Sequence, residues 1–345
     1  MDQNPSTPHR RRPRYPGKNP RRFEDKYKEL DPQRHPDTIA KVLASGKTPA
    51  GSHIPIMVGE ILDVLRPQAG DFAVDCTLGH GGHARAILER IMPGGHLLGL
   101  DVDPLELPRT EERLRADGFG PEQFTVLKSN FAGLPAAIAK TGRTGADLIL
   151  ADLGVSSMQL DNPERGFSTK ADGPLDMRMN PSRGISAAQW LEKVSPEKLA
   201  GILQENADEP HAERVVSTLA GRCFATTTDL AAAIHSALAS LSPEERELSI
   251  RRVFQAIRVE VNEEFTALDA FLRILPQCLN PGGRVAILTF HSGEDRRVKK
   301  AFQAARQEGL YQEISRRVGR ASPSERHNNP RSTSAKLRWA IRSPL

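Results

Sequence analysis

Short apolar runs that alternate with helical patterns constrain this 345-residue chain more than any other feature. Runs typical of buried strands lie at residues 72–77, 97–102, 124–127, 146–153, 284–290 and 337–341. The first four are joined by short helical segments, which is typical of right-handed βαβ units around a parallel sheet. The sequence therefore predicts a doubly wound, mostly parallel α/β fold.

This rhythm stops for about a hundred residues after Gly154. Residues 155–183 are rich in Gly, Asp, Met and Pro and are too long for an ordinary connection, which suggests a functional loop. Helix start signals follow at Ser195-Pro196-Glu197, Thr228-Asp229 and Ser242-Pro243-Glu244-Glu245. We therefore expect the core to be discontinuous and to be interrupted by a loop and an all-helical insertion domain for substrate recognition. The predicted boundaries are 51–157 and 250–345 for the core and 158–249 for the insertion.

The net charge of +5 hides a strong asymmetry along the chain. Residues 1–50 carry twelve basic and six acidic side chains, residues 51–295 carry 23 and 34, and residues 296–345 carry thirteen and three. An acidic body between basic ends favours a nucleic-acid partner, although a solvated arm and an ordinary charged tail would give the same numbers. Residues 1–50 combine Pro, Arg and Lys with few large apolar side chains, so we predict a disordered basic arm.

Several classes of protein are disfavoured by composition. No apolar run approaches the roughly 18 residues of a membrane helix, and no apolar stretch follows the basic N-terminus as in a secretory signal. The three cysteines are far apart and form no Cys-x-x-Cys pair, which argues against a zinc site and a disulfide framework. We expect a cytoplasmic protein without a metal or a membrane contact.

The glycine-rich turn at residues 75–84, DCTLGHGGHA, follows the first predicted strand and opens a helix. Gly79-x-Gly81-x-x-Ala84 also satisfies the dinucleotide-binding pattern, so NAD has to be weighed. A pyrophosphate would be repelled by Asp75 at the strand end, whereas S-adenosylmethionine (SAM) carries a cationic sulfonium and an ammonium group. The turn therefore favours SAM, with Asp75 as a cofactor-binding residue.

Three further strand ends carry polar or aromatic candidates. Asp101 is placed to accept hydrogen bonds from both ribose hydroxyls of either cofactor, and Asn130 or Phe131 would lie beside the adenine. Asp152 follows the fourth strand at the switch point of the sheet, where we expect the chemistry. An exocyclic amine on a base is a poor nucleophile, and a carboxylate that accepts its N–H bonds favours the attacking form. Asp152 is therefore the predicted catalytic acceptor.

The remaining candidates lie in the loop and the later helices. Asp172, Asp176 and Arg178 could close over a substrate or pair with one another, and Arg258 and Asn262 share one face of a predicted helix. His291 could touch the base or a phosphate, while Ser292 and Asp295 fit a capping box. The predicted substrate-binding residues are Asp172, Asp176, Arg178, Arg258, Asn262 and Asp295.

Long motifs in this chain resemble the RsmH (MraW) family of bacterial methyltransferases. They are residues 75–83, 152–161 (DLGVSSMQLD), 165–168 (RGFS), 172–179 (DGPLDMRM), 254–258 (FQAIR) with Asn262, and 290–296 (FHSGEDR). The resemblance implies a SAM-dependent enzyme that methylates N4 of one cytidine, position 1402, in 16S ribosomal RNA, with the assembled small subunit as the expected substrate. It also implies a Rossmann-like core with a helical domain after the fourth strand, and it leaves the oligomeric state open, a homodimer included.

By its motifs, the resemblance also assigns residues to the cofactor. Gly79 lies in the turn, Gly81, Gly82 and His83 would contact SAM, Asp101 would hold the ribose, Phe131 and Asp152 would flank the adenine and the methyl donor, and Gln159 would complete the pocket. The chain departs from the family pattern at Gly293, where leucine is usual, and at residues 208–212. The Asp-Pro-Pro-aromatic signature of other amino methyltransferases is absent, so no stacking aromatic is identified.

Three alternatives to this function remain open at the level of sequence. One is a methyltransferase of the same fold that acts on another polynucleotide amine. The second is an NAD-dependent oxidoreductase. The third is an RNA-binding assembly factor that keeps the cofactor site without turnover.

Overall fold

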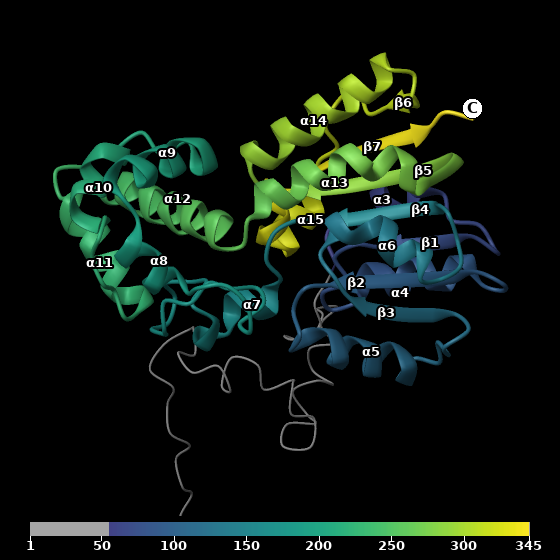
Figure 1. Ribbon diagram of the computed structural model, residues 1–345, viewed down its shortest axis with the longest axis horizontal. Helices are drawn as coiled ribbons and strands as arrows, with labels where there is room; N and C mark the ends of the chain where they lie inside the picture. Colours follow the sequence, from purple (N-terminus) through teal and green to yellow (C-terminus); the bar gives the residue numbers. More distant parts are fainter. Residues whose placement is uncertain (1–54, 345) are drawn as a thin grey trace, which may run out of the picture. The chain divides into compact units, whose positions relative to one another are not determined.

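A seven-stranded sheet forms the centre of the computed structural model, which describes residues 55–344 (Figure 1). The strand order is β3-β2-β1-β4-β5-β7-β6. The strands are β1 (Phe72–Asp75), β2 (His96–Asp101), β3 (Phe124–Lys128), β4 (Ala146–Asp152), β5 (Leu279–Thr289), β6 (Tyr311–Ile314) and β7 (Lys336–Arg342). The first five pair in parallel, and β7 is antiparallel to both β5 and β6. The predicted mostly parallel α/β fold is confirmed.

Helices cover both faces of this sheet. One face carries α3 (Val58–Leu65), α4 (Gly82–Ile91) and α5 (Glu106–Ala116), and the other carries α6 (Leu134–Ala139), α13 (Glu264–Cys278) and α14 (Ser292–Gln307). Side chains along β2 alternate between the two apolar clusters, so that Leu97 packs on the first face and Leu98 on the second. Burial on both faces explains why the parallel strands read as nearly continuous apolar runs.

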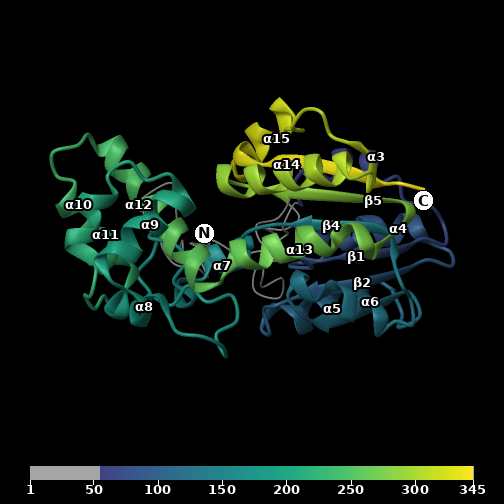
Figure 2. The same cartoon turned by 45° about the horizontal axis from the view of Figure 1, so that its top comes forward.

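A second group of helices has an apolar core of its own. It consists of α8 (Ala187–Lys193), α9 (Pro196–Ala207), α10 (Ala212–Leu219), α11 (Thr227–Ala237) and α12 (Pro243–Val261). In Figure 1 this group lies beyond the end of the sheet toward which the β4 arrow points, and Figure 2 shows the same separation. The chain reaches it through residues 155–183, which contain α7 (Ser157–Asp161) and the short 3-10 helix η3 (Pro163–Arg165) and are called the Met-rich loop below. The boundary expected at residues 249–250 falls inside α12.

The helix starts agree with the sequence in two cases out of three. Ser195 caps α9, and Ser242 forms a capping box with Glu245 at the start of α12. The predicted cap at Thr228-Asp229 is wrong, because Thr226 is the N-cap of α11 and Asp229 is the third helical residue that completes its box. Threonine occupies three successive positions here, so the sequence signal alone did not fix the register.

The predicted basic arm, residues 1–50, lies outside the described residues. Within residues 55–344, no helix combines the length and the apolar character that a membrane crossing requires.

Candidate active site

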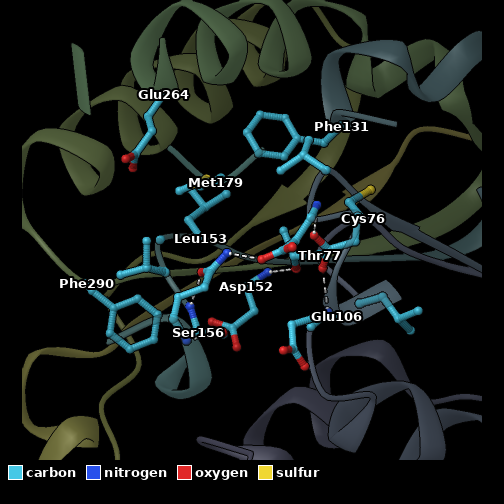
Figure 3. Close-up of a pocket in the computed structure, with 18 of the residues that line it drawn as sticks. Cys76, Thr77, Glu106, Phe131, Asp152, Leu153, Ser156, Met179, Glu264 and Phe290 are labelled. Carbon is cyan, nitrogen blue, oxygen red and sulfur yellow. Dashed lines mark hydrogen bonds between the residues drawn. The ribbon is translucent and has the colours of Figure 1, made fainter. Parts of the chain in front are cut away.

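A cavity of about 380 Å³ lies at the carboxyl ends of the parallel strands. Its lining comes from the segments that follow β1, β2, β3 and β4, and from α12, α13 and the start of α14. Figure 3 shows Asp152 in the middle of this lining, with Phe131 and Cys76 on one side and Phe290 on the other. Ligands of open α/β sheets bind at this edge, so the cavity is the candidate active site.

The glycine turn between β1 and α4 is fixed against α5 and β2. Gly81 has φ +82°, and a Cβ atom there would lie 2.8 Å from Cγ2 of Thr110, so both its conformation and its packing require glycine. The backbone N–H of Gly79 donates to Oδ2 of Asp101 at 2.7 Å. The predicted cofactor residues Gly79, Gly81 and Gly82 all line the cavity.

Asp75 does not line the cavity, although the sequence placed it against the cofactor. It is 1% exposed, and its Oδ1 accepts a hydrogen bond from the backbone N–H of Thr77 at 3.0 Å. The Thr77 hydroxyl in turn accepts from the backbone N–H of Asp152 at 2.6 Å. Burial raises the pKa of Asp75 to about 6. Asp75 therefore lies behind the cavity wall and orients Thr77, which holds the end of β4.

Asp101 is the last residue of β2, and each of its carboxylate oxygens accepts a hydrogen bond from a backbone N–H group. Oδ1 accepts from the backbone N–H of Asp103 at 2.9 Å and Oδ2 accepts from Gly79. Burial raises the pKa of Asp101, and these backbone donors oppose the increase. Because each carboxylate oxygen keeps a further lone pair, the group can still accept hydrogen bonds from two neighbouring hydroxyls.

Phe131 and Asn130 follow β3 and line the same side of the cavity. The Phe131 ring packs against Phe271 of α13 with 5.3 Å between ring centroids. The Asn130 side chain accepts from the backbone N–H of Ala132 and thereby caps the short 3-10 helix η2 (Phe131–Gly133). Asn130 thus has a structural role, while Phe131 offers a fixed aromatic surface for a planar ring.

Asp152 ends β4 and lies between the two sides of the cavity (Figure 3). Its Oδ1 is buried and has no hydrogen-bond partner among the described residues, and its Oδ2 lies 3.6 Å from Nδ1 of His83. Burial, together with the charge of Glu294, raises the pKa of Asp152 to about 7. His83 belongs to the first turn of α4, where a dinucleotide would place its pyrophosphate. The carboxylate that disfavours a dinucleotide is therefore Asp152 rather than Asp75.

A buried network connects the end of β2 with the Met-rich loop. Oδ2 of Asp103 accepts from Nε2 of Gln159 and from Arg165, both at 2.8 Å. The same guanidinium donates to the backbone carbonyls of Arg178 and Met179, at 3.1 and 2.8 Å. Gln159 and Met179 line the cavity, so this network positions part of its wall.

Sequence reasoning gave no role to Asp103 or to Arg165. For Asp103, the only sequence signal is weak: it lies two positions after Asp101, close to the same strand end. Arg165, which is 7% exposed, begins the motif RGFS, and this motif is its only sequence signal because charge and periodicity do not separate it from arginines on the surface.

Two predicted substrate residues, Arg258 and Asn262, do line the cavity. Arg258 forms two hydrogen bonds with the carboxylate of Glu264, at 2.8 and 2.9 Å. Asn262 accepts from the backbone N–H of Met179 and donates to the carbonyl of Met177, both at 2.7 Å. Arg258 thus presents a paired charge to the cavity, and Asn262 holds the loop that carries Met179.

The other predicted substrate residues lie outside the cavity lining. Asp176 and Arg178 pair with each other, with 2.6 Å between NH2 and Oδ2, as the second of the two sequence hypotheses held. Asp172 accepts a hydrogen bond from the Thr228 hydroxyl, and Asp295 pairs with Arg338 of β7 at 2.6 Å. These four side chains have structural partners within the chain.

His291 also lies outside the lining, although its neighbour Glu294 belongs to it. Nε2 of His291 is 3.1 Å from Glu294, and Oε2 of Glu294 accepts from the backbone N–H of Phe290 at 2.8 Å. Burial raises the pKa of Glu294, but His291 and Arg258 outweigh it and the net pKa is lowered. The predicted capping box of Ser292 and Asp295 is wrong, because Glu294 closes the first turn of α14 and the Ser292 hydroxyl donates to Asp208.

Gly293, which departs from the family pattern, has little room for a side chain. A Cβ atom there would lie 2.6 Å from Cζ of Phe265. The Phe265 ring lines the cavity and is covered by the Arg297 guanidinium at 4.2 Å from its centroid. The glycine therefore permits this position of the ring, and a leucine would require the ring to move.

The sheet and the cavity differ from those of the dinucleotide-binding fold. That fold has six parallel strands in the order 3-2-1-4-5-6 and a phosphate at the first glycine turn. Here β7 is antiparallel and lies between β5 and β6, and a carboxylate faces the glycine turn. Strand order and site therefore distinguish this Rossmann-like fold from the dinucleotide-binding one.

The chain belongs to the MraW methylase family, whose model matches residues 50–343. It is 48% identical to ribosomal RNA small subunit methyltransferase H 1 of Lachnoclostridium phytofermentans, over 97% of this chain and 93% of the relative. It is also 48% identical to the protein of that name from Agathobacter rectalis, over 97% and 98%. A relative from Halorhodospira halophila, ribosomal RNA small subunit methyltransferase H, is 41% identical over 87% and 97%. The resemblance inferred from the motifs is confirmed.

Proposed function

We propose that this protein is a SAM-dependent methyltransferase that modifies the N4 amino group of cytidine 1402 in 16S ribosomal RNA. The carrying observation is the identity of 48% to small-subunit rRNA methyltransferases along nearly the whole chain. The position of Asp152 in the cavity supports the amine chemistry. The assignment of the exact nucleotide and of its N4 atom depends on the resemblance of the motifs to the family.

The residues on one side of the cavity fit SAM. Asp101 would hold the two ribose hydroxyls, Phe131 would lie against the adenine, and residues 81–83 would face the amino-acid part. Oδ1 of Asp152 is buried and has no partner within residues 55–344, so this carboxylate suits a cationic ligand. When bound, SAM supplies a methyl group activated by a positively charged sulfur.

The chain itself contributes positioning and a proton acceptor. Asp152 would accept an N–H hydrogen bond from the amine and thus align its lone pair with the methyl carbon at about 3 to 3.5 Å. The largely apolar walls, including Leu153 and Phe290, exclude water and strengthen this interaction. The enzyme therefore needs no covalent intermediate.

The other side of the cavity would receive the target base. Its lining comes from α12, α13 and α14 and includes Arg258, Phe265 and Phe290. A base in an RNA helix is stacked, so the cytosine has to be extruded to reach Asp152. Residues 296–344, the described part of the basic C-terminal segment, form the region best suited to contact RNA phosphates.

The test is transfer of a labelled methyl group from SAM to small ribosomal subunits that lack the modification, followed by nucleotide mapping. Label at N4 of a single cytidine is expected, and label on another amine would establish the first alternative instead. Naked 16S rRNA in a parallel reaction determines whether assembly is required. SAM binding without any transfer would favour the assembly-factor alternative and refute the proposal.

A thermal shift provides an independent check of the cofactor. SAM, or its demethylated product, at 100 times its Kd should stabilise the protein by about 2.7 kcal/mol. Stabilisation by NAD alone would refute the assignment of the cavity to SAM.

A further inference from the structure

His83 faces Asp152 with an atom that is free to accept a proton. Nε2 of His83 lies 2.9 Å from the carbonyl oxygen of Ile56, which can only accept, so this nitrogen carries the hydrogen of the neutral ring. The lone pair is then on Nδ1, which lies 3.6 Å from Oδ2 of Asp152. Both side chains line the cavity.

The groups around this pair are mostly acidic. The charges of Asp75 in β1 and of Glu325 in α15 (Pro323–Asn328) favour a proton on His83. The charge of Glu294 in α14 favours a proton on Asp152. Arg258 and His291 face Glu294 and compensate its charge, and Asp101 acts on Asp75. A negative surrounding of this kind favours the retention of a proton by the pair.

Burial reduces the difference between the pKa values of His83 and Asp152. It lowers the pKa of His83 and raises the pKa of Asp152 to about 7. At this distance, a charge on either group favours the opposite charge on the other.

We infer that His83 is the positioning residue through which Asp152 takes up the proton that the methylated amine loses. This inference rests on the proposed function. The amine lone pair forms the new N–C bond, and the electrons of the broken S–C bond stay on sulfur. The amine then loses one proton, whose N–H electrons remain on nitrogen. The proton is transferred to Oδ2 of Asp152, which donates it as a hydrogen bond to Nδ1 of His83.

The present distance is compatible with this role. At 3.6 Å the two atoms are beyond the range of about 2.7 to 3.2 Å for a hydrogen bond. Hydrogen bonds of this kind are often long without substrate and shorten in the reacting complex. The fixed contact of Nε2 with Ile56 keeps Nδ1 directed at Asp152 during that change.

The kinetic test compares His83→Gln with the wild type in single-turnover methyl transfer to small subunits at saturating SAM. We expect a rate about 10- to 100-fold lower at pH 7, which is at most the lower limit of the usual contribution of proton transfer because His83 acts through Asp152. The loss of SAM affinity should be smaller than the loss of rate, although residues 81–83 would face the amino-acid part of SAM. The matched control is His96→Gln, because His96 bonds Glu122 and Thr125 at the far end of β2 and lies outside the cavity lining. It should be unchanged.

Two results would overturn the inference. One is a His83→Gln rate within twofold of the wild type. The other is a loss of SAM affinity as large as the loss of rate, since that would make His83 a part of the cofactor site alone.

A spectroscopic test does not require a stable His83 variant. In ¹⁵N-histidine NMR spectra, the pKa of the His83 ring should fall by about one unit or more in Asp152→Asn, because the neutral amide no longer stabilises the imidazolium. The same His83 pKa in Asp152→Asn as in the wild type would refute the interaction between His83 and Asp152. This readout is independent of turnover, so it distinguishes failure of the pair from failure of the proposed function, which would appear as a wild-type enzyme that transfers no methyl group to rRNA.

Discussion

The two sides of the cavity are held by different kinds of contact. On the cofactor side, backbone N–H groups at the strand ends fix the carboxylate of Asp101, and the Thr77 hydroxyl, at the end of the neighbouring strand, holds the backbone N–H of Asp152. On the opposite side, single side chains join segments far apart in the sequence, as when Asn262 bonds Met177 and Met179 across 85 and 83 positions. The first side is therefore formed once the sheet is formed, whereas the second depends on a few polar side chains.

Substitutions on the two sides of the cavity should therefore have different effects. Changes on the cofactor side should affect the chemistry or the cofactor directly. Changes in the side-chain contacts should alter the loop and the substrate side while SAM still binds.

The largest effect is expected for Asp152→Asn. The amide cannot take up a proton, so the single-turnover rate should fall about 10²- to 10⁴-fold while the protein stays folded. Rapid-quench methyl transfer with circular dichroism as the folding control measures both. A rate within threefold of the wild type would remove Asp152 from the catalytic assignment.

Arg165→Met tests the strongest contact on the loop side. It would leave the carboxylate of Asp103, which is 1% exposed, without its cation, and loss of one partner of a buried pair costs about 3 to 5 kcal/mol. Urea unfolding measures this change. The control is Arg109→Met, which breaks an exposed pair with Glu106 and should cost less than about 1 kcal/mol. An equal loss of unfolding free energy in the two variants would show that the buried contact of Arg165 with Asp103 is no more stabilising than an exposed ion pair.

The pH dependence of kcat/KM for SAM tests the state of Asp152 in the free enzyme. Asp152 acts in its ionised form, and its pKa is raised to about 7, so activity should be lost as the pH falls through 7. For one such group, the value at pH 5 is about 50-fold below the value at pH 7. The residual activity of Asp152→Asn should lack this step, and an identical step in that variant would assign it to another group.

A smaller effect is expected for Asn262→Ala. Two hydrogen bonds to the loop are lost, which we expect to lower kcat/KM for small subunits about tenfold and to leave the Kd for SAM within twofold. Gln255→Ala is the control on the same helix, because Gln255 bonds the carbonyl of Asn206 and lies outside the cavity lining. A weaker binding of SAM in Asn262→Ala would show that the two sides of the cavity are not separable.

The comparison also explains what could be predicted from the sequence. Strand ends are local features, so the positions of Asp101, Phe131 and Asp152 at one edge of the sheet followed from apolar runs and parallel pairing. Asp75 was misplaced because a strand-end carboxylate can point into the crevice or behind it, and periodicity does not distinguish the two.

Contacts between distant segments could not be predicted in the same way. The pairing of Arg165 with Asp103 and the role of Asn262 depend on how the loop folds back over the sheet, and no periodicity encodes that. Strand β6 was missed because its four residues include two exposed ones and give no clear apolar run. The motifs drew attention to several of these segments, but a motif does not tell which of its side chains face the cavity.

Helix α12 belongs to both parts of the molecule. Its residues Ile250, Val253 and Ile257 pack in the core of the helical group, and Arg258 and Asn262 at its end line the cavity. With 19 residues it is roughly 28 Å long, so a tilt of about 5° would displace its end by roughly 2.5 Å. A displacement of the outer helices would therefore move Arg258 and Asn262, so the proposed target-base side is mechanically joined to the helical group.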